Sequence, residues 1–215
     1  MTGVNASIQP MPADPTPPPL LPARLPARLP TLHVDPLPYE GRLEARPASQ
    51  VDLVVIHCTE LPDLAMARRF GEEVLYPASQ TGNSGHYYLD RDGTVHQWVS
   101  PARVAHHTRG YNPRSIGIEL VNLGRYPAWL AAGHQAMDEA YPPAQVDALV
   151  ALLQALRDTH PSLRLIAGHE DLDTSEVEAS DDPRRMVRRK RDPGPRFPWD
   201  RVLSAVALER LGAPD

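Results

Sequence analysis

Two histidines and one aspartate have the types and positions of a metal site. His57 lies in VVIHCTE and His169 in IAGHEDL, each near the end of an apolar run typical of a buried strand. Such positions suit reactive groups, because a sheet holds them rigidly while the adjoining loops open a cleft. Two imidazoles and one carboxylate are a common ligand set of catalytic zinc, and Asp192 in KRDPGP could supply the carboxylate. Two satisfied core histidines and a loop-capping aspartate would give the same pattern.

A basic stretch, RRKRDPGP at residues 188–195, allows three interpretations. It could bind an anionic partner such as nucleic acid, it could be a solvated loop, or Lys190 and Asp192 could belong to a reaction centre. The formal net charge of -5 and the pI near 6.0 disfavour a general nucleic-acid binder, which spreads positive potential over a whole face. We therefore expect no nucleic-acid partner. Three arginines of the stretch are expected to face water: Arg188, Arg189 and Arg191.

The elements that must position these residues are strands and helices that alternate along the chain. Apolar runs predict buried strands at 51–58, 115–122 and 163–171, and alternation around the turn signal Asp92-Gly93 predicts a hairpin over 85–99. Helical patterns are predicted at 63–73, 144–161 and 198–212. Strands mixed with helices, with one tight hairpin among them, indicate the α/β class: a single domain with a central mixed β-sheet flanked by helices.

Proline usage divides the chain into an arm and this domain. Twelve of the 25 prolines precede residue 48, where they fix φ and block helix formation. We expect a Pro-rich, extended or flexible arm over residues 1–46 and the folded domain over residues 47–215. The single cysteine, Cys58, excludes an intrachain disulfide and a cysteine-based structural zinc site, and we expect a buried thiol.

The same prolines bear on where the protein acts. They interrupt every apolar run of the arm, so no signal-peptide core is recognised there. The apolar runs elsewhere are too short to cross a bilayer, which predicts no transmembrane segment. We expect a cytoplasmic protein; a misassigned start codon would instead allow a periplasmic one.

Five motifs between about residues 50 and 205 resemble a known family when they are taken together and in order. They are VVIHCTE, GHYYLDRDGTVHQWV, VAHHTRGYN followed by SIGIEL, IAGHEDL, and KRDPGP followed by FPW. The chain resembles the zinc-dependent N-acetylmuramoyl-L-alanine amidases of the type-2 class, relatives of phage lysozyme-type amidases and peptidoglycan-recognition proteins. The resemblance implies that residues 47–215 are an amidase catalytic domain with Zn²⁺ as its cofactor.

The resemblance also assigns roles to single residues. It implies that His57, His169 and Asp192 bind zinc, and it places Glu119 in SIGIEL and Lys190 at the catalytic positions of the family. Zinc lowers the pKa of bound water to about 7. Glu119 is then expected to take a proton from that water and to deliver it to the leaving amine, while Lys190 stabilises the oxyanion.

Two further histidines fall in matched motifs. His86 and His107 are expected to contact substrate or to support the metal ligands from behind. Some relatives carry a tyrosine at the position of Gly85, so no catalytic tyrosine is assigned here. An insertion at about 172–187, with the acidic sequence EVEASDD, is expected to loop over the cleft.

The implied substrate is a muropeptide or peptidoglycan. The implied bond joins N-acetylmuramic acid to L-alanine of the stem peptide, and the missing export signal favours recycled 1,6-anhydro muropeptides over intact wall. Cell-wall turnover or recycling would be the role. The alternative is a non-catalytic module that binds peptidoglycan without cutting it. Some relatives of the family are such modules, and they commonly lack a complete ligand set.

Overall fold

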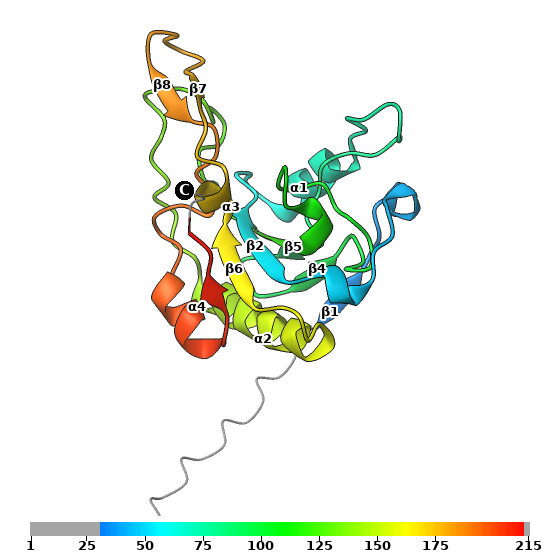
Figure 1. The fold of residues 1–215 in the computed structure, drawn as a ribbon. Helices are drawn as coiled ribbons and strands as arrows, with labels where there is room; N and C mark the ends of the chain where they lie inside the picture. Colours follow the sequence, from blue (N-terminus) through cyan, green and yellow to red (C-terminus); the bar gives the residue numbers. More distant parts are fainter. Residues whose placement is uncertain (1–30, 213–215) are drawn as a thin grey trace, which may run out of the picture.

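A central sheet of seven strands organises the molecule (Figure 1). The computed structural model describes residues 31–212. The seven strands are β1 (Leu32–Val34), β2 (Leu53–Cys58), β3 (Tyr87–Leu89), β4 (Val95–Gln97), β5 (Ser115–Leu120), β6 (Leu165–Gly168) and β9 (Glu209–Arg210). Their order across the sheet is β1-β4-β3-β5-β2-β6-β9, and each neighbouring pair is parallel except the hairpin β3–β4. The predicted α/β class with a central mixed sheet is confirmed.

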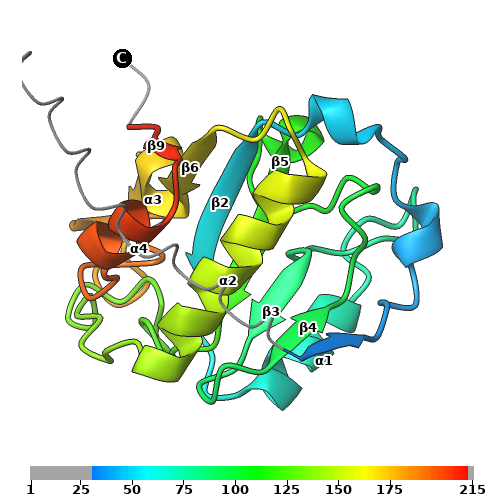
Figure 2. The same ribbon diagram turned by 90° about the horizontal axis from the view of Figure 1, so that it is seen from below.

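Helices flank the sheet. They are α1 (Leu64–Glu72), α2 (Pro143–Thr159), α3 (His169–Leu172) and α4 (Trp199–Ala205), with short 3-10 turns at Glu40–Arg42, Ala48–Gln50 and Asn112–Arg114. Helix α2 crosses one face of the sheet (Figure 2), and the apolar residues at its predicted spacing are buried there. Helix α1 packs on the opposite face, where Ala67 joins a second apolar cluster with Tyr88 and Trp98. None of the helices within residues 31–212 is long and apolar enough to span a membrane.

Strand β2 is an interior strand of the sheet, between β5 and β6, and all six of its residues are buried. Successive side chains of a strand point to opposite faces. Val54, Ile56 and Cys58 pack in the cluster beneath α2, so His57 between them points to the other face. The expected buried thiol of Cys58 is confirmed, and burial raises its pKa well above the usual value. This alternation separates the thiol from the imidazole of its neighbour.

The predicted arm needs correction from residue 32 onward. Strand β1 pairs in parallel with β4, with Leu32 opposite Val95. The side chains of Leu37, Tyr39 and Leu43 are only 1–3% exposed, and the Tyr39 hydroxyl donates to the Gly71 carbonyl at 2.6 Å. The prolines fix φ but do not keep the apolar residues between them out of a core. The remaining arm, residues 1–30, lies outside the described part of the chain.

The C-terminal segment also differs from its prediction. The helix expected over 198–212 ends at Ala205, and the chain then becomes the edge strand β9 beside β6. The Glu209 amide donates to the Arg164 carbonyl at 2.9 Å, and the Leu211 amide donates to the Ile166 carbonyl at 2.8 Å. The free edge of β6 thus competes with the helix for these backbone groups, a choice that a local apolar pattern does not encode.

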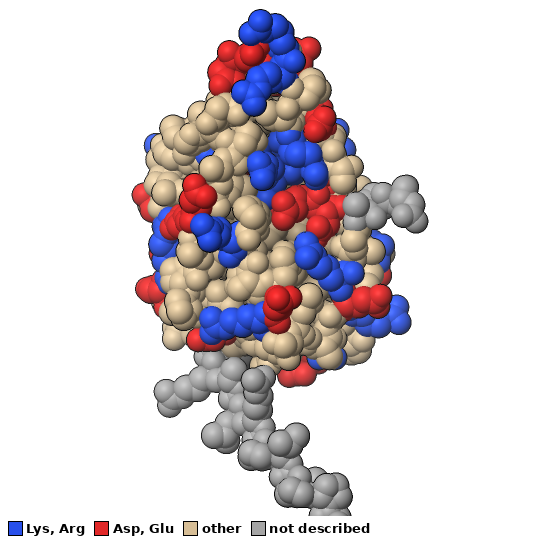
Figure 3. Space-filling view, turned by 90° about the vertical axis from the view of Figure 1, so that its left-hand side faces the viewer, with Lys and Arg blue, Asp and Glu red and all other residues tan. Residues whose placement is uncertain are grey.

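Two long connecting segments, 123–142 and 173–191, extend from the sheet at one side. The inserted segment forms its own hairpin of β7 (Glu176–Glu178) and β8 (Met186–Arg188), which projects at the upper left of Figure 1. It is tied to the segment 123–142: the Ser180 amide donates to Leu130, and the Asp181 carboxylate accepts from the Ala132 amide at 2.6 Å. Acidic and basic side chains lie beside one another at the hairpin tip (Figure 3). The hairpin leads into the segment that carries Lys190 and Asp192.

Candidate metal centre and active site

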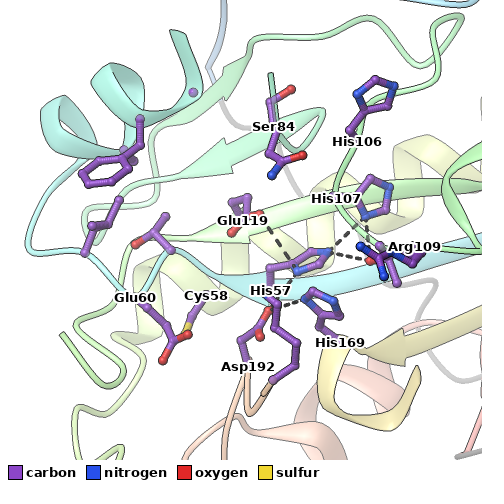
Figure 4. A pocket seen from close by; sticks show the side chains of 18 of the residues that line it. His57, Cys58, Glu60, Ser84, His106, His107, Arg109, Glu119, His169 and Asp192 are labelled. Carbon is purple, nitrogen blue, oxygen red and sulfur yellow. Dashed lines mark hydrogen bonds and ion pairs between the residues drawn. The ribbon is translucent and has the colours of Figure 1, made fainter. Parts of the chain in front are cut away.

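Three neighbouring strand ends meet in one cavity of about 580 Å³. His57 is the penultimate residue of β2, and Glu119 of β5 stands directly opposite it in the parallel register. His169 follows β6 as the first residue of α3, whereas the strand was expected to run to residue 171. Lys190 and Asp192 reach the same cavity from the loop after β8. The structure therefore brings all five residues to one cavity. Figure 4 labels four of them, His57, Glu119, His169 and Asp192.

His57, His169 and Asp192 form a compact group of ligand atoms. Their candidate atoms lie within 4.8 Å of one another, and the three residues are only 2–3% exposed. Asp192 Oδ2 lies 2.9 Å from His57 Nδ1 and 3.1 Å from His169 Nδ1. The second oxygen, Asp192 Oδ1, is buried and has no hydrogen-bond partner among the described residues. A buried carboxylate with a free oxygen needs a cation or another donor, and two nitrogens with one oxygen fit a divalent metal.

A chain of hydrogen bonds selects the tautomer of His57. The Ser115 hydroxyl donates to the Tyr111 carbonyl at 2.8 Å, so its oxygen accepts from His107 Nε2 at 3.2 Å. His107 Nδ1 is then an acceptor for the Nε2 proton of His57, at 3.1 Å. His57 Nδ1 consequently has a lone pair directed at the Asp192 carboxylate. Two acceptors that face one another at 2.9 Å fit a shared cation better than a hydrogen bond.

The protonation states of this group also fit metal binding. Burial lowers the pKa of His57 to about 4, which keeps the imidazole neutral near pH 7. Burial opposes the ionisation of Asp192, but the neighbouring His169 and Lys190 outweigh that effect and hold its pKa well below the usual value. A neutral imidazole and an ionised carboxylate are the forms that bind metal ions.

Glu119 lies beside the ligands without joining them. Its Oε1 is 4.0 Å from His57 Nδ1, and its side chain is 15% exposed toward the cavity. Burial raises the pKa of Glu119 well above the usual value, the charge of Asp192 raises it further, and Lys190 lowers it. A carboxyl group with a raised pKa next to a metal site is suited to accept and return a proton.

His86 is not among the residues that line the cavity, so of its two expected roles, support of the metal ligands from behind remains the prediction. It is fully buried: its Nδ1 accepts from the Gly117 amide at 3.0 Å, and its Nε2 lies 3.0 Å from the Arg103 carbonyl. Burial lowers its pKa to about 3. His86 packs edge-on against His107, with ring centroids 5.6 Å apart. His107, in contrast, lines the cavity and contacts His57 directly.

The three arginines expected to face water are half-buried and bonded instead. Arg188 Nη2 donates to the Glu170 carbonyl at 2.7 Å, and Arg191 Nη1 donates to the Gln135 carbonyl at 2.9 Å. Arg189 forms an ion pair with Asp173. Arg188 and Arg191 thus bind backbone carbonyls of neighbouring segments, while Arg189 lines the cavity beside Lys190.

Sequence reasoning missed several supporting residues. Asn112 Oδ1 accepts from the backbone amides of His107 and Thr108, at 3.1 and 2.7 Å, and so shapes the loop that presents His107. Asparagine is a frequent residue for such side-chain turns, so this signal was available in TRGYN. Glu60 and Arg125 form a buried ion pair across 65 residues of sequence, a separation that no local pattern reveals.

Comparison with known proteins gives a consistent result. A family model described as N-acetylmuramoyl-L-alanine amidase matches residues 47–195. The endolysin of Enterobacteria phage K11 is 33% identical over 85 residues, which cover 40% of this chain and 52% of the phage protein, about half of its length. The solved N-acetylmuramoyl-L-alanine amidase LysC from Clostridium intestinale URNW has a TM-score of 0.59 at 19% identity, with 84% of this chain and 99% of that chain covered. E. coli AmiD, solved with an anhydro-N-acetylmuramic acid peptide, has a TM-score of 0.57 at 23% identity, with coverages of 77% and 60%. At these identities the two structures establish a shared fold.

Proposed function

This chain belongs to the N-acetylmuramoyl-L-alanine amidase family, and on that premise we propose that it is a zinc-dependent hydrolase of muramyl peptides. The resemblance and the amidase class expected from the sequence are confirmed by this membership. The bond to be cleaved is the amide between the lactyl group of N-acetylmuramic acid and the amino group of L-alanine. Water adds across that bond, so the products are a lactyl carboxylate and a peptide with a free N-terminus.

The convergence of His57 Nδ1, His169 Nδ1 and Asp192 Oδ2 carries the proposal. The two short contacts to Asp192 and its unpartnered second oxygen leave a charge that a divalent cation would balance. These three residues would hold zinc. When bound, zinc supplies a strong Lewis acid, which makes water a usable nucleophile near neutral pH and polarises a carbonyl oxygen.

The other residues of the cavity complete the chemistry. Glu119 accepts a proton from the attacking water and delivers it to the departing amine of L-alanine, the two roles that one carboxyl group can take in sequence. Lys190 borders the same cavity, where its ammonium stabilises the negative charge that develops on the carbonyl oxygen. His107 holds the ring of His57, so that the Nδ1 lone pair stays directed at the centre.

We infer that a 1,6-anhydro muropeptide is the preferred substrate and that recycling or turnover of the cell wall is the role. E. coli AmiD, which shares the fold, was solved with anhydro-N-acetylmuramic acid carrying an L-Ala-D-γ-Glu-L-Lys peptide. The alternative of a module that only binds peptidoglycan is disfavoured, because Glu119 has the position and the raised pKa of a proton carrier next to a complete ligand set.

Exchanging one carboxylate for its amide tests the proposal. Glu119→Gln removes the proton acceptor but keeps the shape of the side chain, so the variant should retain its zinc and lose roughly 100-fold or more in kcat. Glu178→Gln is the matched control, because Glu178 is exposed on β7, away from the cavity. Peptide release from an anhydromuramyl tripeptide is measured by mass spectrometry. An unchanged kcat in Glu119→Gln would remove Glu119 from the mechanism.

A further inference from the structure

A buried ion pair stands beside the active-site cavity but takes no part in the chemistry described above. Arg125 is 1% exposed, and its Nε and Nη2 donate to the Glu60 carboxylate at 2.7 and 3.0 Å. Glu60 follows β2 by two residues, three positions after His57, and it borders the cavity (Figure 4). The pair therefore adjoins the segment that presents one of the proposed metal ligands.

The guanidinium of Arg125 also donates hydrogen bonds to the segment that presents Lys190. Its Nη1 donates to the Arg188 carbonyl at 2.9 Å, and its Nη2 donates to the Arg189 carbonyl at 3.3 Å. These are the two peptide groups directly before Lys190. One planar guanidinium group thus links the segment after β2 to the loop after β8. Its planarity fixes the angles between the hydrogen bonds that it donates.

The backbone around the pair is adapted to it. Glu60 has a φ of +50°, a left-handed conformation that is uncommon for a residue other than glycine. Gly124 also has a positive φ, and a Cβ there would lie 2.6 Å from Glu60 Cγ. A left-handed glutamate and an obligatory glycine are unfavourable for local stability alone. A buried ion pair also contributes little net stability, because desolvation offsets much of its Coulomb energy.

We propose that Arg125 is a positioning residue for Lys190: through Glu60 and the carbonyls of residues 188 and 189, it sets the distance between the lysine ammonium and the metal centre. This inference rests on the proposed function. Arg125→Lys keeps one positive charge for Glu60 but removes the planar guanidinium. The loop before Lys190 then loses the hydrogen bonds that hold it. A displacement of about 1 Å at a catalytic group lowers kcat roughly 100-fold, while KM and zinc content should stay near the wild-type values.

A second ion pair of the same chemistry provides a matched control. Arg91 donates to Glu139 at 2.7 and 3.1 Å and to the Pro62 carbonyl at 2.8 Å, away from the loop at 186–191. Arg91→Lys should leave kcat unchanged. Hydrogen exchange of residues 186–191 gives a readout that needs no substrate: it should accelerate in Arg125→Lys and stay at the wild-type rate in Arg91→Lys.

A double variant separates positioning from stability. Glu60→Gln with Arg125→Met removes both charges, so it leaves no unpaired buried charge even if Arg125→Lys fails to fold. The proposal predicts a folded, zinc-loaded double variant whose kcat is still roughly 100-fold low. Recovery of kcat to within about 3-fold of wild type, or unchanged exchange at 186–191, would overturn it. If the wild-type protein itself releases no peptide, the proposed function fails, and the exchange rates alone decide whether Arg125 holds the loop.

Discussion

The Glu119 side chain occupies space that is free because residue 85 is a glycine without a Cβ. Gly85→Ala tests whether the position of Glu119 matters for catalysis. A Cβ at position 85 would lie 2.8 Å from Glu119 Cγ and 3.2 Å from the Gly117 carbonyl oxygen. Two carbon atoms prefer about 3.5–4.0 Å, so the glutamate has to move by roughly 0.7 Å or more. The φ of Gly85 lies outside the left-handed region, so alanine is compatible with the backbone conformation, and the contact with Glu119 is the larger of the two perturbations.

The displacement converts into a rate. A shift of nearly 1 Å in a proton-transfer group predicts a loss of roughly 30- to 100-fold in kcat/KM, or about 2–3 kcal/mol of transition-state stabilisation. Steady-state hydrolysis of an anhydromuramyl tripeptide measures it, with Gly41→Ala as control, since a Cβ there meets nothing within 4 Å. Thermal unfolding measures the loss in free energy of unfolding, which should stay within the about 1–3 kcal/mol that is typical of an overpacked site. Wild-type kcat/KM in Gly85→Ala would refute the placement of Glu119.

Two further predictions concern single side chains. Burial lowers the pKa of His86 to about 3, below its unfolded value of 6.5, so the unfolded chain binds a proton that the folded chain does not, and stability falls as pH drops below 6.5. Between pH 7 and pH 5 this costs about 2 kcal/mol, and denaturant unfolding of His86→Asn should lack that part of the pH dependence; an unchanged slope would contradict it. Lys190→Met should lower kcat roughly 100- to 1,000-fold with zinc retained, and steady-state kinetics with metal analysis would contradict this if kcat stayed the same.

The sequence places two of the proposed ligands through local signals. His57 and His169 each follow a run of buried apolar residues, and parallel strands bring their carboxyl ends to the same sheet edge. Register adds Glu119, which pairs directly with His57. Lys190 and Asp192 come from a loop, and their convergence was implied only by resemblance. The structure accounts for it by the short contacts of Asp192 to both histidines.

Features that depend on distant partners were missed. The apolar residues at 37–43 become core only because Ala67 of α1, Tyr88 of β3 and Trp98 supply a surface for them. The C-terminal segment becomes a strand only because β6 has a free edge, and His86 looks like a site residue until its two ring nitrogens are satisfied by Gly117 and Arg103. The ion pair of Arg125 and Glu60 could not be predicted either, because its partners lie far apart in the sequence. Long-range pairing and satisfied buried polar groups decide these positions, and neither has a local pattern.

We propose that His57, His169 and Asp192 hold a zinc ion that is needed to cut one amide bond. The direct measurement is mass analysis of the products formed from a 1,6-anhydro-N-acetylmuramoyl tripeptide by the chelator-stripped protein, before and after zinc is added back. We predict no products before addition, and afterwards two: the anhydro sugar with a free lactyl carboxylate and the intact tripeptide with a free N-terminus. Cleavage at full rate by the stripped protein, or cleavage at another bond, would contradict the account.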